Sequence, residues 1–127
     1  MRSAKKQLSQ YASLLKDNEK AKDLLDKGKE LSKRIDTWER ILIQPDQKTF
    51  QDVINFNNML NAQLLHLRGY LDVADPKVTK GAKDRLMDLK ADWNVYEDER
   101  DAIVNSEMAA YNKAFEALNL PAIILKD

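Results

Sequence analysis

Acidic side chains recur between residues 84 and 101, at a spacing that could place two carboxyl groups side by side. Asp84, Asp88 and Asp92 follow one another at intervals of four, and Glu97 comes soon after. On a helix, residues four apart lie about 5–6 Å apart at Cβ, close to the carboxylate separation of a retaining glycosidase. A working pair also needs a concave, partly dry site that separates the two pKa values. A convex helix face provides none, so we interpret these carboxylates as a solvated face and predict no catalytic residue.

The chain has few residues that could bind a metal ion or a cofactor. His66 is the single histidine, and no carboxylate stands three or four residues from it. There is no cysteine, which excludes thiolate metal sites and disulfides. Asp92 and Asn94 resemble the start of a calcium loop, but Glu97 occupies the position that requires glycine. Gly81 stands alone among lysines and forms no phosphate-binding loop. We therefore expect no metal ion and no cofactor.

The aromatic side chains could be proposed as a strip on which sugar rings stack. These residues are Trp38, Phe56, Trp93 and Tyr96. All four stand at positions that continue apolar helical patterns, so we interpret them as core residues.

One segment carries a candidate partner-contact surface. Between residues 50 and 61 the chain is poor in charge and mixes aromatic and apolar side chains with amides. Such a mixture is typical of protein–protein contacts. The alternative is a connection whose amides cap the following helix. The candidate contact residues are Phe50, Val53, Asn55, Asn57, Asn58 and Asn61.

Apolar residues recur every three or four positions along most of the chain, which predicts long helices. The pattern predicts two long helices at about 4–42 and 80–118 and one short helix at about 56–73. Because the connections are short, consecutive helices should be antiparallel. The predicted fold is therefore all-α, an elongated antiparallel three-helix bundle forming a single domain over 1–127. Asp17 is a polar exception in the first pattern, and Gly28 within it predicts a close helix crossing.

Two connections separate the predicted helices. Pro45 ends the first helix, and Thr49 with Asp52 predicts a capped turn. We expect 44–55 to be an ordered connection with one turn, although a helix running from residue 50 is the alternative. The short helix covers less than half the length of the long ones. The uncovered half must be completed by this connection, by the apolar tail Ala122–Leu125, or by another molecule.

Composition narrows the function further. The chain has 127 residues, with 21 basic and 21 acidic side chains. A net charge of zero argues against nucleic-acid binding, which depends on neutralising phosphates. No stretch approaches the roughly 20 apolar residues of a membrane span. Residues 1–40 hold eleven basic against seven acidic residues, which we interpret as helices of opposite charge lying together.

A family resemblance rests on the connection and its flanks. The segments that carry it are Trp38–Arg40, Ile43–Pro45, Gln47–Phe56, Leu60–Leu64, Asp75–Pro76, Val78–Thr79, Gly81–Ala82 and Leu120–Ile124. These segments resemble the C-terminal region of bacterial sortilin-like proteins, which are propeller proteins with BNR-type repeats commonly labelled glycosyl hydrolases. The resemblance implies that the chain is a C-terminal piece of a longer exported protein, following one or more β-propellers, and that it acts outside the cytoplasm. It transfers no catalytic residue.

Three functions remain open. The leading hypothesis is a non-catalytic helical module that packs on its parent propeller or on another protein. A homo-oligomerisation coiled coil is the first alternative, which the polar residues Asp17, Arg100 and Glu107 oppose. A carbohydrate-binding or glycoside-hydrolysing domain using Asp84 and Asp88 is the second.

Overall fold

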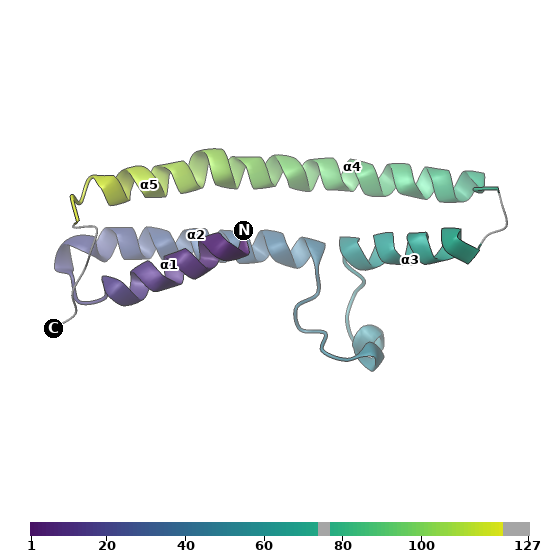
Figure 1. The fold of residues 1–127 in the computed structure, drawn as a ribbon, viewed down its shortest axis with the longest axis horizontal. Coiled ribbons are helices and arrows are strands. Elements are labelled where there is room, and N and C mark those ends of the chain that lie inside the picture. Colours follow the sequence, from purple (N-terminus) through teal and green to yellow (C-terminus); the bar gives the residue numbers. More distant parts are fainter. Residues whose placement is uncertain (74–76, 121–127) are drawn as a thin grey trace. The chain divides into compact units, whose positions relative to one another are not determined.

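The computed structural model describes residues 1–73 and 77–120, apart from the side chains of Phe50 and Val53, and these residues form helices and no strand (Figure 1). The all-α prediction is confirmed. The described residues form four continuous helical stretches, so the predicted set of three helices is not confirmed. The elements are α1 (Arg2–Leu14), η1 (Glu19–Ala21), α2 (Lys22–Leu42), η2 (Phe50–Ile54), α3 (Leu60–Val73), α4 (Lys80–Ala102), the π-helical segment η3 (Ile103–Met108) and α5 (Ala109–Glu116).

The chain divides into two compact units. Unit 1 is Met1–Thr37 with Arg100–Asp127, and unit 2 is Trp38–Glu99. In unit 1, α1, the larger part of α2 and α5 surround a core. In unit 2, α3 and α4 pack together with the last residues of α2. The predicted contact of the apolar tail Ala122–Leu125 lies outside the described residues.

The predicted helix over 4–42 is wrong, because the chain breaks between α1 and α2. Asp17 and Asn18 are poor helix formers, and the Asn18 side chain accepts a hydrogen bond from the Lys20 backbone N–H at 3.0 Å. Beyond this cap, α2 runs back alongside α1 (Figure 1). The break also changes which leucine is buried. Leu14 continues the apolar pattern of the predicted helix but is 39% exposed, whereas its neighbour Leu15 is 1% exposed.

Gly28 allows a close approach at the centre of unit 1, as its place in the apolar pattern predicts. A Cβ atom added to Gly28 would lie 3.2 Å from Cε2 of Tyr111 and 3.8 Å from Cδ2 of Leu8. Tyr111 is buried, and the ring of Tyr11 lies 4.8 Å from that of Phe115. The absent side chain therefore leaves room for α5 and α1 to pack on the same turn of α2.

The predicted third helix, 80–118, matches α4, η3 and α5 closely. Its buried positions Ala82, Leu89 and Ile103 are spaced in sevens, but Tyr111 follows Ile103 by eight residues. At about 100° per residue, eight α-helical steps would turn Tyr111 about 80° away from the core. The wider π-helical turn of η3 takes up the additional residue and restores the alignment. The change in the spacing of buried residues after Ile103 is thus accommodated within one turn of the helix.

The core of unit 2 joins α3 to α4. Its buried members are Leu60, Leu67, Ala82 and Leu89, with Leu42, Leu71, Trp93 and Tyr96 packed against them. Trp38 is buried, and its indole N–H donates to the Tyr96 carbonyl oxygen at 2.7 Å. Three of the four aromatic residues are therefore core or core-packing residues, as predicted, and Phe56 is half-buried.

The short helix begins later than its predicted start at residue 56, and the alternative of a helix from residue 50 is also wrong. After η2, the chain makes a turn and a bend at Asn55 and Phe56 and has no regular structure from there until α3 begins at Leu60. Asn55, Asn57 and Asn58 lie in this interval, and asparagine side chains compete with helical backbone hydrogen bonds. At the start of α4, the Ala82 backbone N–H donates to Thr79 Oγ1 at 3.2 Å, so Thr79 caps α4.

Candidate functional site

The predicted contact segment is held by a capping box. Asp52 Oδ2 accepts hydrogen bonds from the backbone N–H groups of Lys48 and Thr49, each at 2.9 Å. The Thr49 side chain in turn accepts from the Asp52 backbone N–H. Hydrogen bonds to the Asp52 carboxyl lower its pKa. The largest contribution comes from the Thr49 backbone N–H, followed by the Lys48 backbone N–H and the Thr49 side chain. The capped turn expected between residues 49 and 52 is confirmed.

This cap should open in acid. A lowered carboxyl pKa stabilises the folded turn above the ordinary value of 3.8, and that contribution is lost as the pH falls through the lowered value. We expect the amide resonances of Lys48 and Thr49 to move together with Asp52 in an NMR titration from pH 5 to pH 2. Asp52→Asn, which keeps an acceptor oxygen, should hold the turn without this transition. An unchanged Thr49 amide across the titration would contradict the assignment.

The candidate contact residues whose side chains are described all lie on the surface. Asn55, Asn57, Asn58 and Asn61 are all exposed, and the side chains of Phe50 and Val53 lie outside the described residues. Ile54, between them, is 86% exposed. Their role in binding a partner stays a prediction, and Asn58 lines a hollow.

That hollow has a volume of about 290 Å³ and lies where the chain enters α3. Gln63 donates to the Asn58 carbonyl oxygen at 2.8 Å, and Arg85 of α4 donates to the Gln63 side-chain oxygen. His66 and Tyr70 of α3 complete the polar lining. Sequence reasoning missed Arg85, because its place beside Asn58 depends on how α3 and α4 are aligned. The hollow offers amide, imidazole and guanidinium groups, all on exposed residues apart from Gln63.

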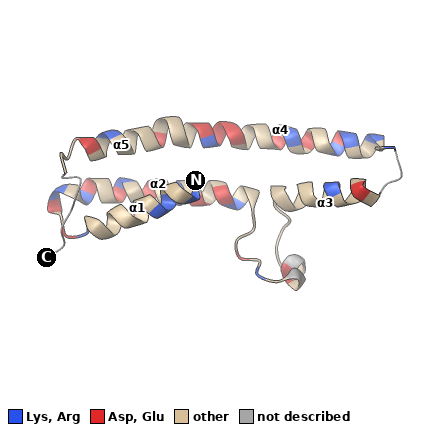
Figure 2. Ribbon diagram, viewed as in Figure 1, with Lys and Arg blue, Asp and Glu red and all other residues tan. Residues whose placement is uncertain are grey.

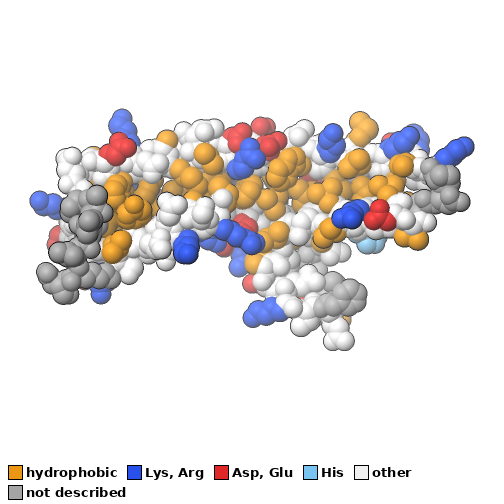
Figure 3. All heavy atoms as spheres, in the orientation of Figure 1, with side chains coloured by type: hydrophobic (Ala, Val, Ile, Leu, Met, Phe, Trp, Pro, Cys, Tyr) orange, Lys and Arg blue, Asp and Glu red, His pale blue; other side chains and the backbone are white. Residues whose placement is uncertain are grey.

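On the other side of the α3–α4 contact, apolar side chains are exposed. Leu64 and Leu86 each follow a residue of the hollow, Gln63 and Arg85, by one position, which is about 100° around the helix. They are 37% and 41% exposed, and Leu65 beside them is 61% exposed. We call Leu64, Leu65 and Leu86 the apolar flank. Figure 3 shows hydrophobic side chains gathered along the line where α3 and α4 meet.

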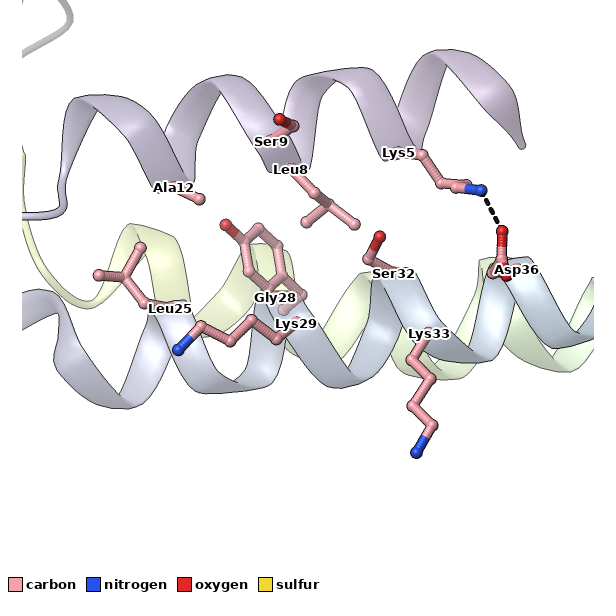
Figure 4. A pocket seen from close by; sticks show the side chains of 11 residues that line it. Lys5, Leu8, Ser9, Ala12, Leu25, Gly28, Lys29, Ser32, Lys33 and Asp36 are labelled. Atoms are coloured by element: carbon pink, nitrogen blue, oxygen red, sulfur yellow. Dashed lines mark hydrogen bonds and ion pairs between the residues drawn. The ribbon is translucent and has the colours of Figure 1, made fainter.

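Unit 1 contains a groove of about 400 Å³ between α1 and α2 (Figure 4). Leu8 points from α1 toward α2, and Tyr111 also lines the groove. Burial raises the pKa of the Tyr111 hydroxyl, with a smaller contribution from Tyr11. No sequence pattern indicated this groove, because it exists only where the chain turns back on itself.

The charges around this groove do not converge on it. Lys5 is held by Asp36 at 2.6 Å, the pair drawn as a dashed line in Figure 4. Lys29 is held by Asp26 at 3.0 Å. The Lys33 ammonium points away from α1. The groove is thus an apolar hollow bordered by charges that are engaged or directed elsewhere.

The three aspartates that could serve hydrolysis lie exposed on α4. Asp84 is paired with Lys80 at 2.6 Å, and Asp88 lies 4.0 Å from Arg85. Asp92 is also exposed. Nothing in this arrangement favours sugar chemistry, which stays an untested alternative.

In residues 1–73 and 77–120, no group of three or more histidine, aspartate or glutamate side chains could hold a metal ion. Within the same residues, no helix combines the length and the apolar character needed to cross a membrane.

Comparison with known proteins gives no further guide. No family model, curated protein or solved structure matches this chain.

Proposed function

We propose that this chain is a non-catalytic helical module that packs on another protein through the apolar flank. The observation that carries the proposal is the exposure of Leu64 and Leu86 beside the α3–α4 contact, with exposed Leu65 about 100° further round α3 on its outer face. Apolar surface grouped in this way favours association, because burying it yields about 25 cal/mol for each Å². In the same proposal, the module is an elongated antiparallel bundle at the C-terminal end of a sortilin-like propeller protein outside the cytoplasm.

Unit 2 differs from unit 1 in how its apolar side chains are covered. In unit 1, α1 lies against α2 and buries Leu8 and Leu15. In unit 2, no third long helix covers the α3–α4 pair among the described residues. The sequence predicts that the short middle helix leaves half of the bundle uncovered. The incomplete half is unit 2, and we propose that a partner covers it.

The border of the apolar flank indicates what that partner should carry. Lys83 and Lys90 of α4 are exposed and lie three and four residues from Leu86, so they are its neighbours on the helix surface. Arg68 of α3 is exposed and lies 3.5 Å from Asp72. We therefore propose a partner surface with an apolar centre and an acidic border, presented by the parent β-propeller.

Calorimetric titration of this chain with the propeller encoded before it in the same gene tests the proposal. We expect binding, and Leu65→Asp should weaken it by at least about tenfold, because a carboxylate would be desolvated at the contact. Leu14→Asp is the matched control, since Leu14 is 39% exposed on α1. It should bind like the unchanged chain. No binding, equal loss in both variants, or a gene that encodes no propeller would contradict the proposal.

A further inference from the structure

The outer side of α4 carries a row of residues at intervals of four. Met87 is 70% exposed, Val95 is 57% exposed, and Ala91 between them is also exposed. Lys83 precedes this row by four residues and Glu99 follows it by four. Residues four apart form a continuous ridge on a helix, the kind of ridge that packs between the ridges of a second helix. The ridge lies opposite the buried positions Ala82 and Leu89.

We infer that this ridge binds the same ridge of a second copy of the chain, in antiparallel orientation, with Ala91 near the crossing. The positions of the ridge are symmetric about Ala91: Met87 and Val95 lie four residues from it, and Lys83 and Glu99 lie eight residues from it. When two copies pack in antiparallel orientation, Met87 of each lies opposite Val95 of the other, and Lys83 lies opposite Glu99. Such a self-complementary surface generates a closed two-fold dimer. Ala91 at the centre allows the two backbones to approach closely.

The charge distribution along α4 selects the antiparallel orientation. Residues 80–90 hold four basic and two acidic side chains, whereas residues 91–99 hold four acidic side chains and no basic one. Figure 2 shows the blue positions toward the start of α4 and the red ones toward its other end. A parallel pair would bring acidic half against acidic half, which costs free energy, while an antiparallel pair brings opposite charges together.

One pair of like charges opposes this arrangement. The two-fold symmetry about Ala91 brings Asp84 of one copy near Asp98 of the other. Asp84 is already paired with Lys80 at 2.6 Å, so that turn of the helix has no net negative charge. The Lys80 ammonium can then face Asp98 of the second copy.

The expected dimer is weak. A stable interface buries about 800 Å² per partner, and a single helix crossing buries less. Dissociation constants in the upper micromolar range follow, and added salt should weaken binding further, because it screens the charge pairs at the two ends of the crossing. This inference concerns a second copy of the chain, whereas the proposed function concerns a different protein on the apolar flank; Lys83 lies at the border of both surfaces.

Sedimentation equilibrium from 10 µM to 1 mM, at about 50 mM salt, tests the inference. Met87→Asp should weaken dimerisation by more than about tenfold, because two methionine contacts are lost and two carboxylates face an acidic segment. Lys83→Glu and Glu99→Lys should each weaken it about threefold to tenfold, since each change affects two charge pairs. The double variant Lys83→Glu with Glu99→Lys should recover the affinity to within about twofold.

Two control variants carry the same kinds of substitution at surface positions outside the ridge. Leu65→Asp on α3 and Lys113→Glu on α5 should leave dimerisation unchanged, and circular dichroism confirms that each variant is folded. A chain that stays monomeric at 1 mM overturns the inference. So does a dimer that Met87→Asp leaves intact, or a charge-exchanged double variant that remains as weak as the single ones.

Discussion

A chain lacking Asn105 should keep its helical content and change its free energy of unfolding by no more than about 1 kcal/mol, whereas a chain lacking Asn94 should lose on the order of 3 kcal/mol. Asn105 is exposed and lies in the π-helical segment η3, which holds one residue more than α-helical register requires. Removing it converts η3 to α-helix and leaves Ile103 and Tyr111 seven residues apart, still on one face.

Around Asn94 the helix is regular, so no additional residue compensates for its deletion. Asn94 lies within α4, between Leu89 and Tyr96, which are seven residues apart and both belong to the core of unit 2. Removing one residue there turns these two side chains about 100° relative to each other, so one of them leaves the core.

Urea denaturation followed by circular dichroism compares the two deletions. Equal destabilisation by both would show that η3 does not carry the register change. A larger loss for the Asn105 deletion would contradict the account of the π-helical segment directly.

The second large effect concerns glycine at two helical positions with different surroundings. Gly28→Leu should cost about 3 kcal/mol, because its Cβ would lie 3.2 Å from the Tyr111 ring and the rest of the side chain has no space. Gly28→Ala should be close to neutral. It gains up to about 1 kcal/mol of helix propensity, and displacing the ring offsets this gain.

Gly69 of α3 provides the matched control. Nothing lies within 4 Å of a Cβ added there, so Gly69→Ala should stabilise the chain by about 0.5–1 kcal/mol through helix propensity alone. Thermal unfolding of the four proteins gives the comparison. A Gly28→Leu variant as stable as the unchanged chain would exclude close packing of Tyr111 and Leu8 on α2.

The buried faces of α2 and α4 were predictable from the sequence because local periodicity determines them. Leu24, Leu31 and Ile35 of α2 follow three–four spacing and are all buried. Gly28 in that pattern correctly indicated a close approach. The capped turn at Thr49 was also predictable, since a capping box involves only residues near one another in sequence.

The break between α1 and α2 was not predictable in the same way. Asp17 was identified as an exception, but one polar residue at a seam position is compatible with a continuous helix. The chain turns there because α1 gains more by packing on α2 and α5, where Leu8 and Leu15 become buried. That gain comes from tertiary packing, which can override an apolar pattern that suits a continuous helix.

The surfaces proposed for binding were only partly visible in the sequence. The amides at residues 55–61 were identified, and they are exposed. Neither the hollow with Arg85 nor the apolar flank could be derived, because both depend on the alignment of α3 with α4. Leu64 and Leu86 fit the apolar pattern of their helices, so the sequence predicts them as core. Their exposure follows from the absence of a third long helix over this pair in the described residues.

Thiol protection of the apolar flank tests the proposed function most directly. The chain has no cysteine, so Leu65→Cys introduces a single thiol whose alkylation rate reports its exposure. With the propeller at saturating concentration, the rate should fall at least about fivefold, while Ser9→Cys on α1 should react at an unchanged rate. A complex in which the thiol at position 65 reacts as fast as in the free chain would contradict the account.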